Sequence, residues 1–550
     1  MYLVRNHNQF VNRLLISATR RSFMVAGIAL VSLLAAIAII MVWNGAPIMN
    51  GRPWDVPTLL DGAWRITNGQ VPHRDFYSHL GAFPFYLTRL GMKFSQPCLS
   101  AIVYGNVVLM AILALTSAAI LARRTSALYA FLFSMFVGLL VVTPRPLGDP
   151  YDYNDYAMLY NRFGEALLAL FSVLAFLPPV QPGGRRVFNI LEGFIMGLLL
   201  VGLWFDKLNY FVIAVFFFVL AGALRFPNTD AVLACIVSAP VILGLVLIIT
   251  DIPLGAMIGD FRITAGAQSP GNRLATLAIQ TVKAAPLLPL LLLITWESMS
   301  GRGRKQTGWL FKFREWFLPL ALFGGALLLL SSNCQVGEMP LLAVAGLYSA
   351  EMIRRTSLAT DSTEYFFTGV RNVAGLCLML FFLLPTLKID LMALRNCTFA
   401  AFTKDFVTSD VLKTTALRDF RFAPNGTRSQ FSREYLESLD EGIQLVRRHA
   451  SPDMRLMVAM FTDPFNVALG LRPPEGGLTC WDTIMLNQRS HPPLKRLVGN
   501  STHILALRKQ SAQKETYGDE WDALGLETVE ETKRFVLLKV SQVAARSLDR

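Results

Sequence analysis

Long apolar runs separated by short basic turns are the feature that most constrains this chain. An α-helix needs about 20 residues to cross ~30 Å of hydrocarbon. Only 16% of the residues are charged and the mean hydropathy is +0.45, whereas soluble domains carry about 25% charged residues. We therefore predict a polytopic α-helical membrane protein with about eleven transmembrane helices. The runs lie at residues 23–43, 99–122, 126–143, 157–180, 189–206, 209–225, 230–250, 277–297, 317–333, 339–353 and 370–388.

Basic residues indicate which ends of these runs face the cytoplasm. The first run is longer than the 7–15 apolar residues typical of a signal peptide, so we expect an uncleaved anchor with a cytoplasmic N-terminus. Alternation from there places every later basic cluster on the cytoplasmic side, as the positive-inside rule requires. With eleven crossings the C-terminus is exoplasmic. The clusters are Arg123–Arg124, Arg185–Arg186, Arg225, residues 302–314 and Arg354–Arg355.

The net charge of +13 does not indicate nucleic-acid binding. The basic residues are scattered in these turns, and no basic face is long enough to follow a phosphate backbone. We expect no nucleic-acid partner.

The character of the chain changes after Lys388. A helical pattern near residues 433–449 and strand-like runs at 456–461, 503–507 and 534–540 predict a small α/β domain. We divide the chain into a transmembrane domain at 1–389, with exoplasmic loops at 44–97 and 143–156, and an exoplasmic α/β domain at 390–550. Cys397 and Cys480 both fall in the second domain. A disulfide between them and two unpaired thiols are both compatible with an oxidising compartment.

The first long loop contains a polar and aromatic stretch, Trp54–Leu87, between two apolar runs. An amphipathic helical pattern follows Asp55 and is predicted to end at Gly69. This loop carries Asp55, Asp61 and Asp75, and the second loop carries Asp155. Carboxylates beside a bilayer are desolvated, which raises their pKa values and suits a general base. The alternative interpretation is that they are solvated loop charges.

A second group of ionisable residues, Asp206-Lys207, lies between two apolar runs in a connection too short to leave the membrane surface. The lysine could extend harmlessly to the interface or bind an anionic phosphate at headgroup depth.

These motifs resemble those of GT-C glycosyltransferases of the protein-mannosyltransferase and lipid A aminoarabinose-transferase type. In that group the first outer loop has an aspartate, often Asp-Glu, then an amphipathic juxtamembrane helix, a glycine and Pro-Tyr-x-Asp-Phe. Here Asp55, Gly69 and the sequence VPHRDF at 71–76 follow the same order. The sequence FDKLNY at 205–210 is similar to a lysine-bearing turn of the group, and YNRFGEALLAL at 160–170 to the helix after its second outer loop.

The resemblance implies an inverting glycosyltransferase that takes a sugar from a polyprenyl-phosphate carrier. Asp55 would be the catalytic base and Lys207 would pair with the carrier phosphate. Arg74, or alternatively Arg162, would supply a second phosphate contact.

The chain departs from the group's pattern at two positions. Position 56 is Val, so the role of a second carboxylate would fall to Asp61, Asp75 or Asp155. His73 replaces the group's Tyr. Four residues are candidates for lining the acceptor cavity: His73, Asp61, Gln335 and Glu338.

No cofactor is expected. His73, Asp75, His79 and Asp55 could ligate a divalent ion, but their spacing matches no zinc motif, and histidines hydrogen-bonded within the loop are the other interpretation. The expected partners are a polyprenyl-phosphate-linked sugar, membrane lipids and an acceptor that is a lipid, glycan or protein. We expect a bacterial inner-membrane protein with a periplasmic C-terminal domain in the cell envelope. A transporter or flippase, favoured by Lys283 in the eighth run, is the alternative, and a membrane scaffold is a third.

Overall fold

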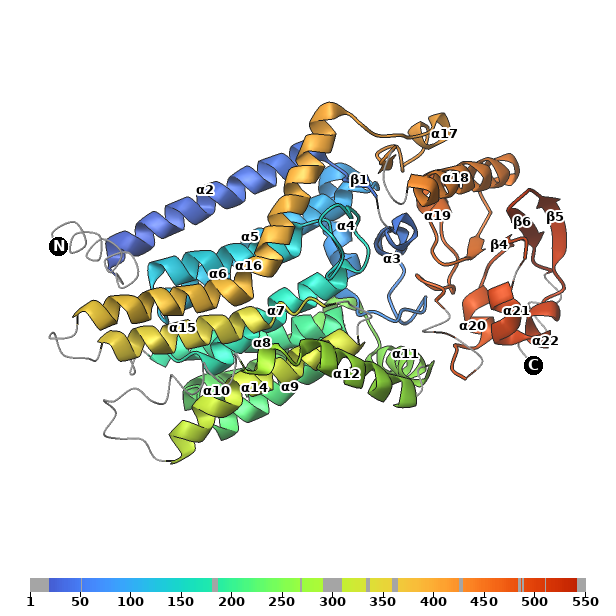
Figure 1. Ribbon diagram of the computed structural model, residues 1–550. Helices are drawn as coiled ribbons and strands as arrows, with labels where there is room; N and C mark the ends of the chain where they lie inside the picture. The colour runs from blue at the N-terminus through green and yellow to red at the C-terminus, as the bar shows by residue number, and fades with distance from the viewer. Residues whose placement is uncertain are drawn as a thin grey trace.

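Helices lying side by side form one end of the computed structural model, and a small sheet lies at the other end (Figure 1). The N-terminus and the C-terminus lie at these opposite ends. We call the end of the bundle that meets the sheet the domain end and the opposite one the far end. The structure describes residues 19–50, 52–180, 186–267, 270–289, 309–332, 337–358, 365–424, 429–482, 486, 489–509 and 511–541.

The apolar runs of the sequence form the long helices of the bundle, as predicted. Helix α7 is the central one, because every side chain from Leu159 to Phe176 is buried. The bundle helices are α2 (Arg20–Asn44), α5 (Ser100–Leu121), α6 (Ala127–Val142), α7 (Leu159–Phe176), α8 (Arg186–Asp206), α9 (Leu208–Ala223), α10 (Thr229–Thr250), α14 (Trp309–Ser332), α15 (Leu342–Leu358) and α16 (Tyr365–Thr403).

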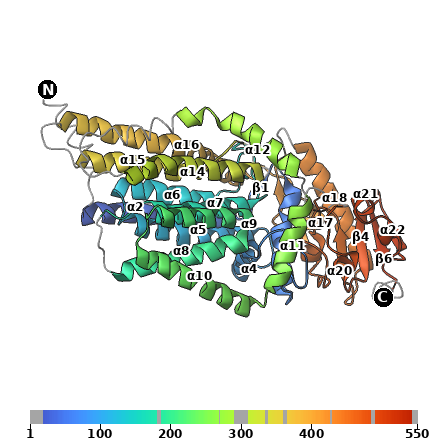
Figure 2. The same ribbon diagram turned by 90° about the horizontal axis from the view of Figure 1, so that it is seen from below.

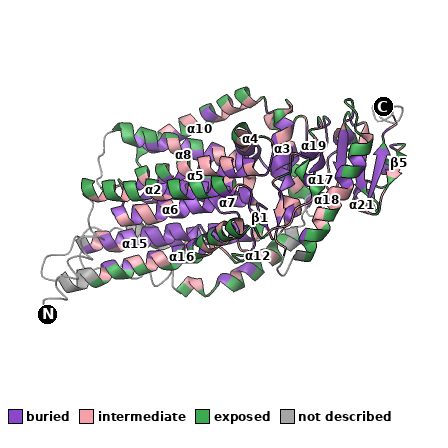
Figure 3. Cartoon of the chain, turned by 90° about the horizontal axis from the view of Figure 1, so that it is seen from above, coloured by how far each residue is buried: buried purple, intermediate pink, exposed green. Residues whose placement is uncertain are grey.

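The outer helices expose large apolar side chains, as expected for contact with lipid (Figure 3). On α10, Ile248 is 79% exposed and Ile249 is 80% exposed. Contiguous apolar surface of this kind is rare on soluble proteins and marks contact with another apolar phase. The chain is therefore a polytopic helical protein of the membrane.

By length and composition, six helices of the described part can cross a membrane: α2, α5, α7, α8, α10 and Val370–Thr403 of α16. Shorter apolar helices are Ala127–Val142, Leu208–Ala223 and Phe317–Ser332. The two other predicted spans differ. The run 277–297 lies partly on α12 (Pro270–Ala284) and largely outside the described residues, and the run 339–353 forms α15, which is less apolar.

Several of the predicted basic clusters meet at the far end of the bundle. Arg124 pairs with Glu192 at 2.5 Å, and Arg355 donates to the backbone carbonyls of Arg124 and Pro178, each at 2.7 Å. The turns after α5 and α7 and the end of α15 therefore lie together, which agrees with the predicted alternation of the helices. Which end faces the cytoplasm stays a prediction.

The first long loop, by contrast, lies at the domain end and is itself largely helical. It contains the predicted amphipathic helix, α3 (Pro57–Thr67), followed by Gly69 with a φ of +87° that an L-residue rarely adopts. The loop then forms α4 (Phe83–Ser95), which the sequence did not indicate as a separate helix. Helices α11 (Leu254–Ala267) and α12 lie at the same end, with α11 beside the C-terminal region (Figure 2).

The C-terminal region contains a four-stranded sheet in the order β3-β4-β6-β5. Strand β3 (Leu456–Ala459) is parallel to β4 (His503–Leu507), and β6 (Phe535–Lys539) is antiparallel to both β4 and β5 (Glu527–Glu531). The amphipathic α18 (Ser429–His449) packs against β6. The predicted helix and three predicted strands are thus confirmed, but β5 was missed because its sequence, ETVEE, is that of an exposed edge.

Helix α3 connects the bundle to this region (Figure 1). The Trp64 indole donates to the Leu471 carbonyl at 2.8 Å, and the Arg65 guanidinium donates to the carbonyls of Pro474 and Gly476 at 3.2 and 2.8 Å. A second link joins β1 (Ile48–Met49) to β2 (Arg421–Phe422) in parallel register. Helix α16 runs across the predicted domain boundary at 389/390, which stays a prediction.

Cys397 and Cys480 are both free, buried thiols. Cys397 lies within α16 rather than in the α/β region. The structure therefore shows two unpaired thiols and no disulfide between them.

The pair formed by Asp61 and Arg65, 2.9 Å apart and both buried, gives a test of the α3 connection. Replacing Arg65 by Met leaves the Asp61 carboxylate buried without its partner and the Gly476 carbonyl without its donor, whereas the Pro474 carbonyl keeps the Gln70 amide. We expect the free energy of unfolding to fall by about 3–5 kcal/mol, measured as a lower thermal midpoint in detergent.

Lys93→Met, at an exposed position of α4, is the matched control and should melt like the wild type. The double variant Asp61→Asn/Arg65→Met should recover part of the loss. An Arg65→Met protein that melts with the wild type would show that this link is not important for stability.

Candidate functional site

Asp55 occupies a short turn at the domain end of the bundle. It ends a 3₁₀ helix, Pro53–Asp55, directly before α3. The Thr462 hydroxyl of the C-terminal region donates to the Trp54 carbonyl at 2.6 Å and so holds this turn from the other side. Asp55 is half-buried, and within the described residues its carboxylate makes no hydrogen bond or ion pair. Both oxygens are therefore available to an incoming group.

Asp155 joins the two predicted outer loops. It is fully buried and accepts hydrogen bonds from the backbone N–H groups of Arg52 at 2.6 Å and of Ala157 at 2.9 Å. The first N–H belongs to the Asp55 turn and the second to the segment that leads into α7. The structure therefore brings Asp55 and Asp155 together, although 100 positions separate them in the sequence.

Both carboxyl groups have raised pKa values. Burial raises the pKa of Asp55 to about 7, and the negative charge of Asp155 adds to the rise while the Arg52 guanidinium opposes it. Burial also raises the pKa of Asp155 to about 6, against the two backbone N–H donors that favour its ionised form. At neutral pH Asp155 is thus mostly ionised, and Asp55 is about half ionised.

Lys207 also lies beside the start of α7. It connects α8 to α9, donates to the Asn161 side-chain oxygen at 3.0 Å, and places its ammonium 4.8 Å from the centre of the Tyr160 ring. Both partners are in the first turn of α7, a few residues after Asp155. The carboxylate of Asp155 and the ammonium of Lys207 therefore both lie beside the start of α7.

Close backbone packing fixes the Lys207 turn against the first loop. The Gly81 N–H donates to the Asp206 carbonyl at 3.1 Å. A Cβ atom at position 81 would lie 2.0 Å from the Phe205 carbonyl oxygen, so only glycine fits.

The two arginines predicted to bind the carrier phosphate have other partners. Arg74 is 43% exposed and pairs with Asp75 and Asp251 at the surface. Arg162 is fully buried and donates to three backbone carbonyls and to Asp390, the last at 2.6 Å. Neither guanidinium is free to hold a phosphate. Asp75 accepts from Arg74 and from the Val71 N–H, which makes it part of the turn rather than of the Asp55 site.

His73 and Asp61 are buried in contacts between the loops and the C-terminal region. The Nδ1 atom of His73 lies 2.9 Å from the Asp260 carboxylate, which also accepts from Arg496 at 2.6 Å. Asp61 pairs with Arg65 as described above. Asp260 and Arg496 were not predicted, because nothing local in the sequence distinguishes them from other loop charges.

His79 is also buried, next to Lys207. Burial and the positive charge of Lys207 lower its pKa to about 3, so the imidazole is neutral. Within the described part of the chain, no group of three or more His, Cys, Asp or Glu side chains is arranged to hold a metal ion.

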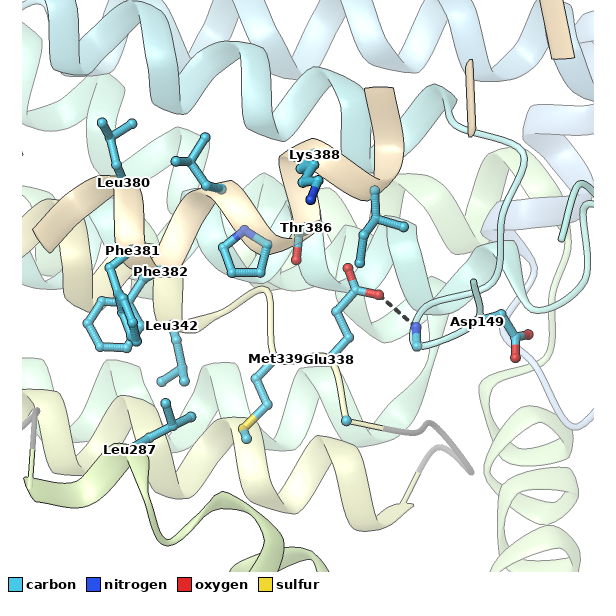
Figure 4. A pocket seen from close by; sticks show the side chains of 15 residues that line it. Asp149, Leu287, Glu338, Met339, Leu342, Leu380, Phe381, Phe382, Thr386 and Lys388 are labelled. Carbon is cyan, nitrogen blue, oxygen red and sulfur yellow. Dashed lines mark hydrogen bonds between the residues drawn. The ribbon is translucent and has the colours of Figure 1, made fainter. Parts of the chain in front are cut away.

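Glu338 belongs to a buried ionic cluster at the domain end. Its carboxylate accepts hydrogen bonds from both terminal nitrogens of Arg145, at 3.0 and 2.9 Å. Arg145 also pairs with Asp390 at 3.0 Å. Glu338 is the member of this cluster that lines a cavity of about 720 Å³ between α15 and α16 (Figure 4). That this cavity takes the acceptor, as predicted for Glu338, stays a prediction, and Gln335 lies outside the described residues.

No protein-family model and no curated protein matches the chain. Three solved structures are similar to it. ArnT from Cupriavidus metallidurans in the apo state is 13% identical, with a TM-score of 0.44 over 94% of this chain and 99% of that one. The same protein bound to undecaprenyl phosphate is 14% identical, with a TM-score of 0.41 over 94% and 98%.

The archaeal oligosaccharyltransferase AglB from Archaeoglobus fulgidus, in complex with an inhibitory peptide and a dolichol-phosphate, is 11% identical, with a TM-score of 0.33 over 94% and 74%. ArnT, a lipid A aminoarabinose transferase, and AglB are both GT-C-fold glycosyltransferases, the group that the first loop resembles in sequence. All three TM-scores lie below 0.5. The likeness therefore says nothing about the chemistry of the site, which we infer from the residues of this chain alone.

The raised pKa of Asp55 predicts how stability changes with pH. The folded chain keeps a proton on Asp55 up to about pH 7, but the unfolded chain releases it near pH 3.8. Because the folded state binds more protons in this window, the contribution of Asp55 to stability falls as the pH rises through it. Asp55→Asn removes this effect and should raise the stability at pH 8 by about 1–2 kcal/mol, with little change at pH 4.

Thermal midpoints at the two pH values measure the difference. Asp152→Asn, at an exposed position of the second loop, should change neither midpoint. Equal loss of stability by Asp55→Asn at both pH values would contradict the raised pKa.

Proposed function

We propose that the chain is an inverting glycosyltransferase that moves a sugar from a polyprenyl-phosphate carrier to an acceptor at the exoplasmic face of the membrane. The Asp55 carboxylate takes the proton of the acceptor hydroxyl or amine. The acceptor atom then forms a bond with the anomeric carbon while the bond from that carbon to the phosphate oxygen breaks. The phosphate leaves with the electron pair, on the face opposite to the attack.

The observation that carries this proposal is the state of Asp55. It is a half-buried carboxylate without a bonding partner in the described structure, and its pKa is about 7. A general base works best when its pKa lies near the operating pH, since it is then both ionised and basic enough to take a proton. A charge that served only the fold would be paired.

Lys207 supplies the positive charge that a departing phosphate needs. It lies beside the α7 start, held by Asn161 and the Tyr160 ring. The donor phosphodiester carries one negative charge and the departing phosphate monoester gains a second, so a fixed ammonium stabilises the leaving group more than the bound donor. Because Arg74 and Arg162 have other partners, we assign the phosphate to Lys207 without them.

The neighbouring His79 adds no charge, since its pKa of about 3 keeps it neutral. Its ring lies 6.4 Å from that of Tyr160, next to Lys207. We propose that it shapes the wall of the phosphate site and leaves the full charge on the lysine.

A transporter remains the alternative, favoured by two buried carboxylates in the predicted spans. Both oxygens of Asp206 and one oxygen of Glu165 have no hydrogen-bond partner. Buried carboxylates of this kind occur in ion and proton pathways. However, Asp206 is the last residue of α8 and Glu165 is in the second turn of α7, so both are near the domain end rather than at the midplane where transporters bind their substrates. Lys283 is exposed on α12.

The transfer reaction tests both assigned residues. With labelled sugar on a polyprenyl-phosphate carrier and a membrane-lipid extract as the source of acceptors, Asp55→Asn should lower the turnover about 10²–10⁴-fold. Lys207→Gln should lower it about 100-fold, because the leaving group loses its counter-charge. Asp152→Asn and Lys93→Gln are the matched controls and should keep the wild-type rate. Full activity of a folded Asp55→Asn protein would exclude Asp55 as the base.

The pH dependence of turnover separates the roles of the two carboxylates. Activity of the wild type should rise with pH through about 7, as Asp55 loses its proton. Asp155→Asn removes a negative charge that raises the pKa of Asp55, so this rise should move to lower pH. A rise that stays in place, or moves to higher pH, would show that Asp155 does not act on the base.

A further inference from the structure

The cavity between α15 and α16 has one apolar end and one polar end (Figure 4). Its volume of about 720 Å³ lies within the range of ~300–1,000 Å³ typical of ligand sites. At the polar end, the N–H of Gly148 donates to Glu338 at 2.7 Å. The apolar end is lined by Leu287, Met339, Leu342, Leu380, Phe381 and Phe382.

The polar end carries an unbalanced positive charge. Glu338 is neutralised by Arg145, and Asp149 pairs with Arg52 at 3.8 Å. Lys388 also lines the cavity, is exposed, and makes no hydrogen bond or ion pair among the described residues. A lysine without a counter-charge, at the mouth of an apolar space in a membrane helix, attracts an anion that has an apolar tail.

The polar end also points to the Asp55 turn. Asp149 lines the cavity, and its partner Arg52 is the residue directly before the turn that ends in Asp55. Lys207, already assigned to the carrier phosphate, contacts Asn161 and Tyr160 at the start of α7. The Asp55 turn is linked to that helix start through Asp155 and to the cavity through Arg52 and Asp149.

We propose that this cavity binds the acceptor and that the acceptor is an anionic lipid. Its chain lies among Leu342, Phe381 and Phe382, its anionic group pairs with Lys388, and the rest of its headgroup extends past Asp149 toward Asp55. The assignment as acceptor rests on the proposed transferase function. The lipid site itself does not, because it can be occupied without any transfer.

Native mass spectrometry of the full-length protein in detergent measures binding directly. The probes are phosphatidylglycerol, phosphatidylcholine with the same chains, and polyprenyl phosphate. The wild type should retain phosphatidylglycerol about tenfold better than phosphatidylcholine. Lys388→Gln should remove this preference, Lys388→Arg should keep it, and Lys93→Gln should leave it unchanged. Leu384→Trp, which fills the cavity, should weaken retention of both phospholipids.

Polyprenyl phosphate distinguishes the two possible sources of the anionic lipid. We expect its binding to fall in Lys207→Gln and to stay unchanged in Lys388→Gln. If Lys388→Gln abolishes it instead, the cavity is the carrier site and the acceptor assignment is overturned. Equal retention of the two phospholipids by the wild type, or no effect of Lys388→Gln, would overturn the lipid site. Selective binding at Lys388 in a protein that never transfers sugar would keep the site and reject the transferase.

Discussion

The carboxylate of Asp155 is the buried link between two segments that lie far apart in the sequence. Its bonds to the N–H groups of Arg52 and Ala157 hold the first outer loop against the start of α7. Helix α7 is buried along its whole length, so it provides a fixed base for this contact. The positions of Asp55 and Lys207 both depend on that helix start. The candidate site is therefore organised by the bundle and only completed by the C-terminal region.

The C-terminal region contributes to the candidate site through a few contacts. Thr462 holds the carbonyl of Trp54, and the segment after Leu471 receives the donors of α3. Asp55 itself has no comparable partner. An isolated carboxylate in a half-buried position lowers the stability of the fold, and functional sites commonly retain such groups because reactivity requires them. The absence of pairing at Asp55 contrasts with the closed cluster of Arg145, Glu338 and Asp390 nearby.

Local patterns predicted the parts of the fold that depend on local forces. Apolar runs predicted the bundle helices, and the helical spacing of apolar residues predicted α3. The alternation of apolar and polar residues predicted β3, β4 and β6. The highly charged β5 has no such pattern. The sequence placed Asp55 and Asp155 in two loops at the same end of the bundle, but it did not distinguish Asp155 from Asp61 and Asp75 as the neighbour of Asp55. Sequence alone could not assign Arg162 to Asp390, because pairing between distant charges depends on how α7 packs against α16.

Helix α16 extends over 39 residues and contains Pro385. Proline has no N–H group to offer the carbonyl four residues earlier, and Figure 1 shows a bend in this helix. Pro385, Lys388 and Phe381 all line the cavity, so the cavity lies along the bend. Because α16 is one continuous helix, the residues that shape this cavity and those that lead the chain into the C-terminal region belong to the same element.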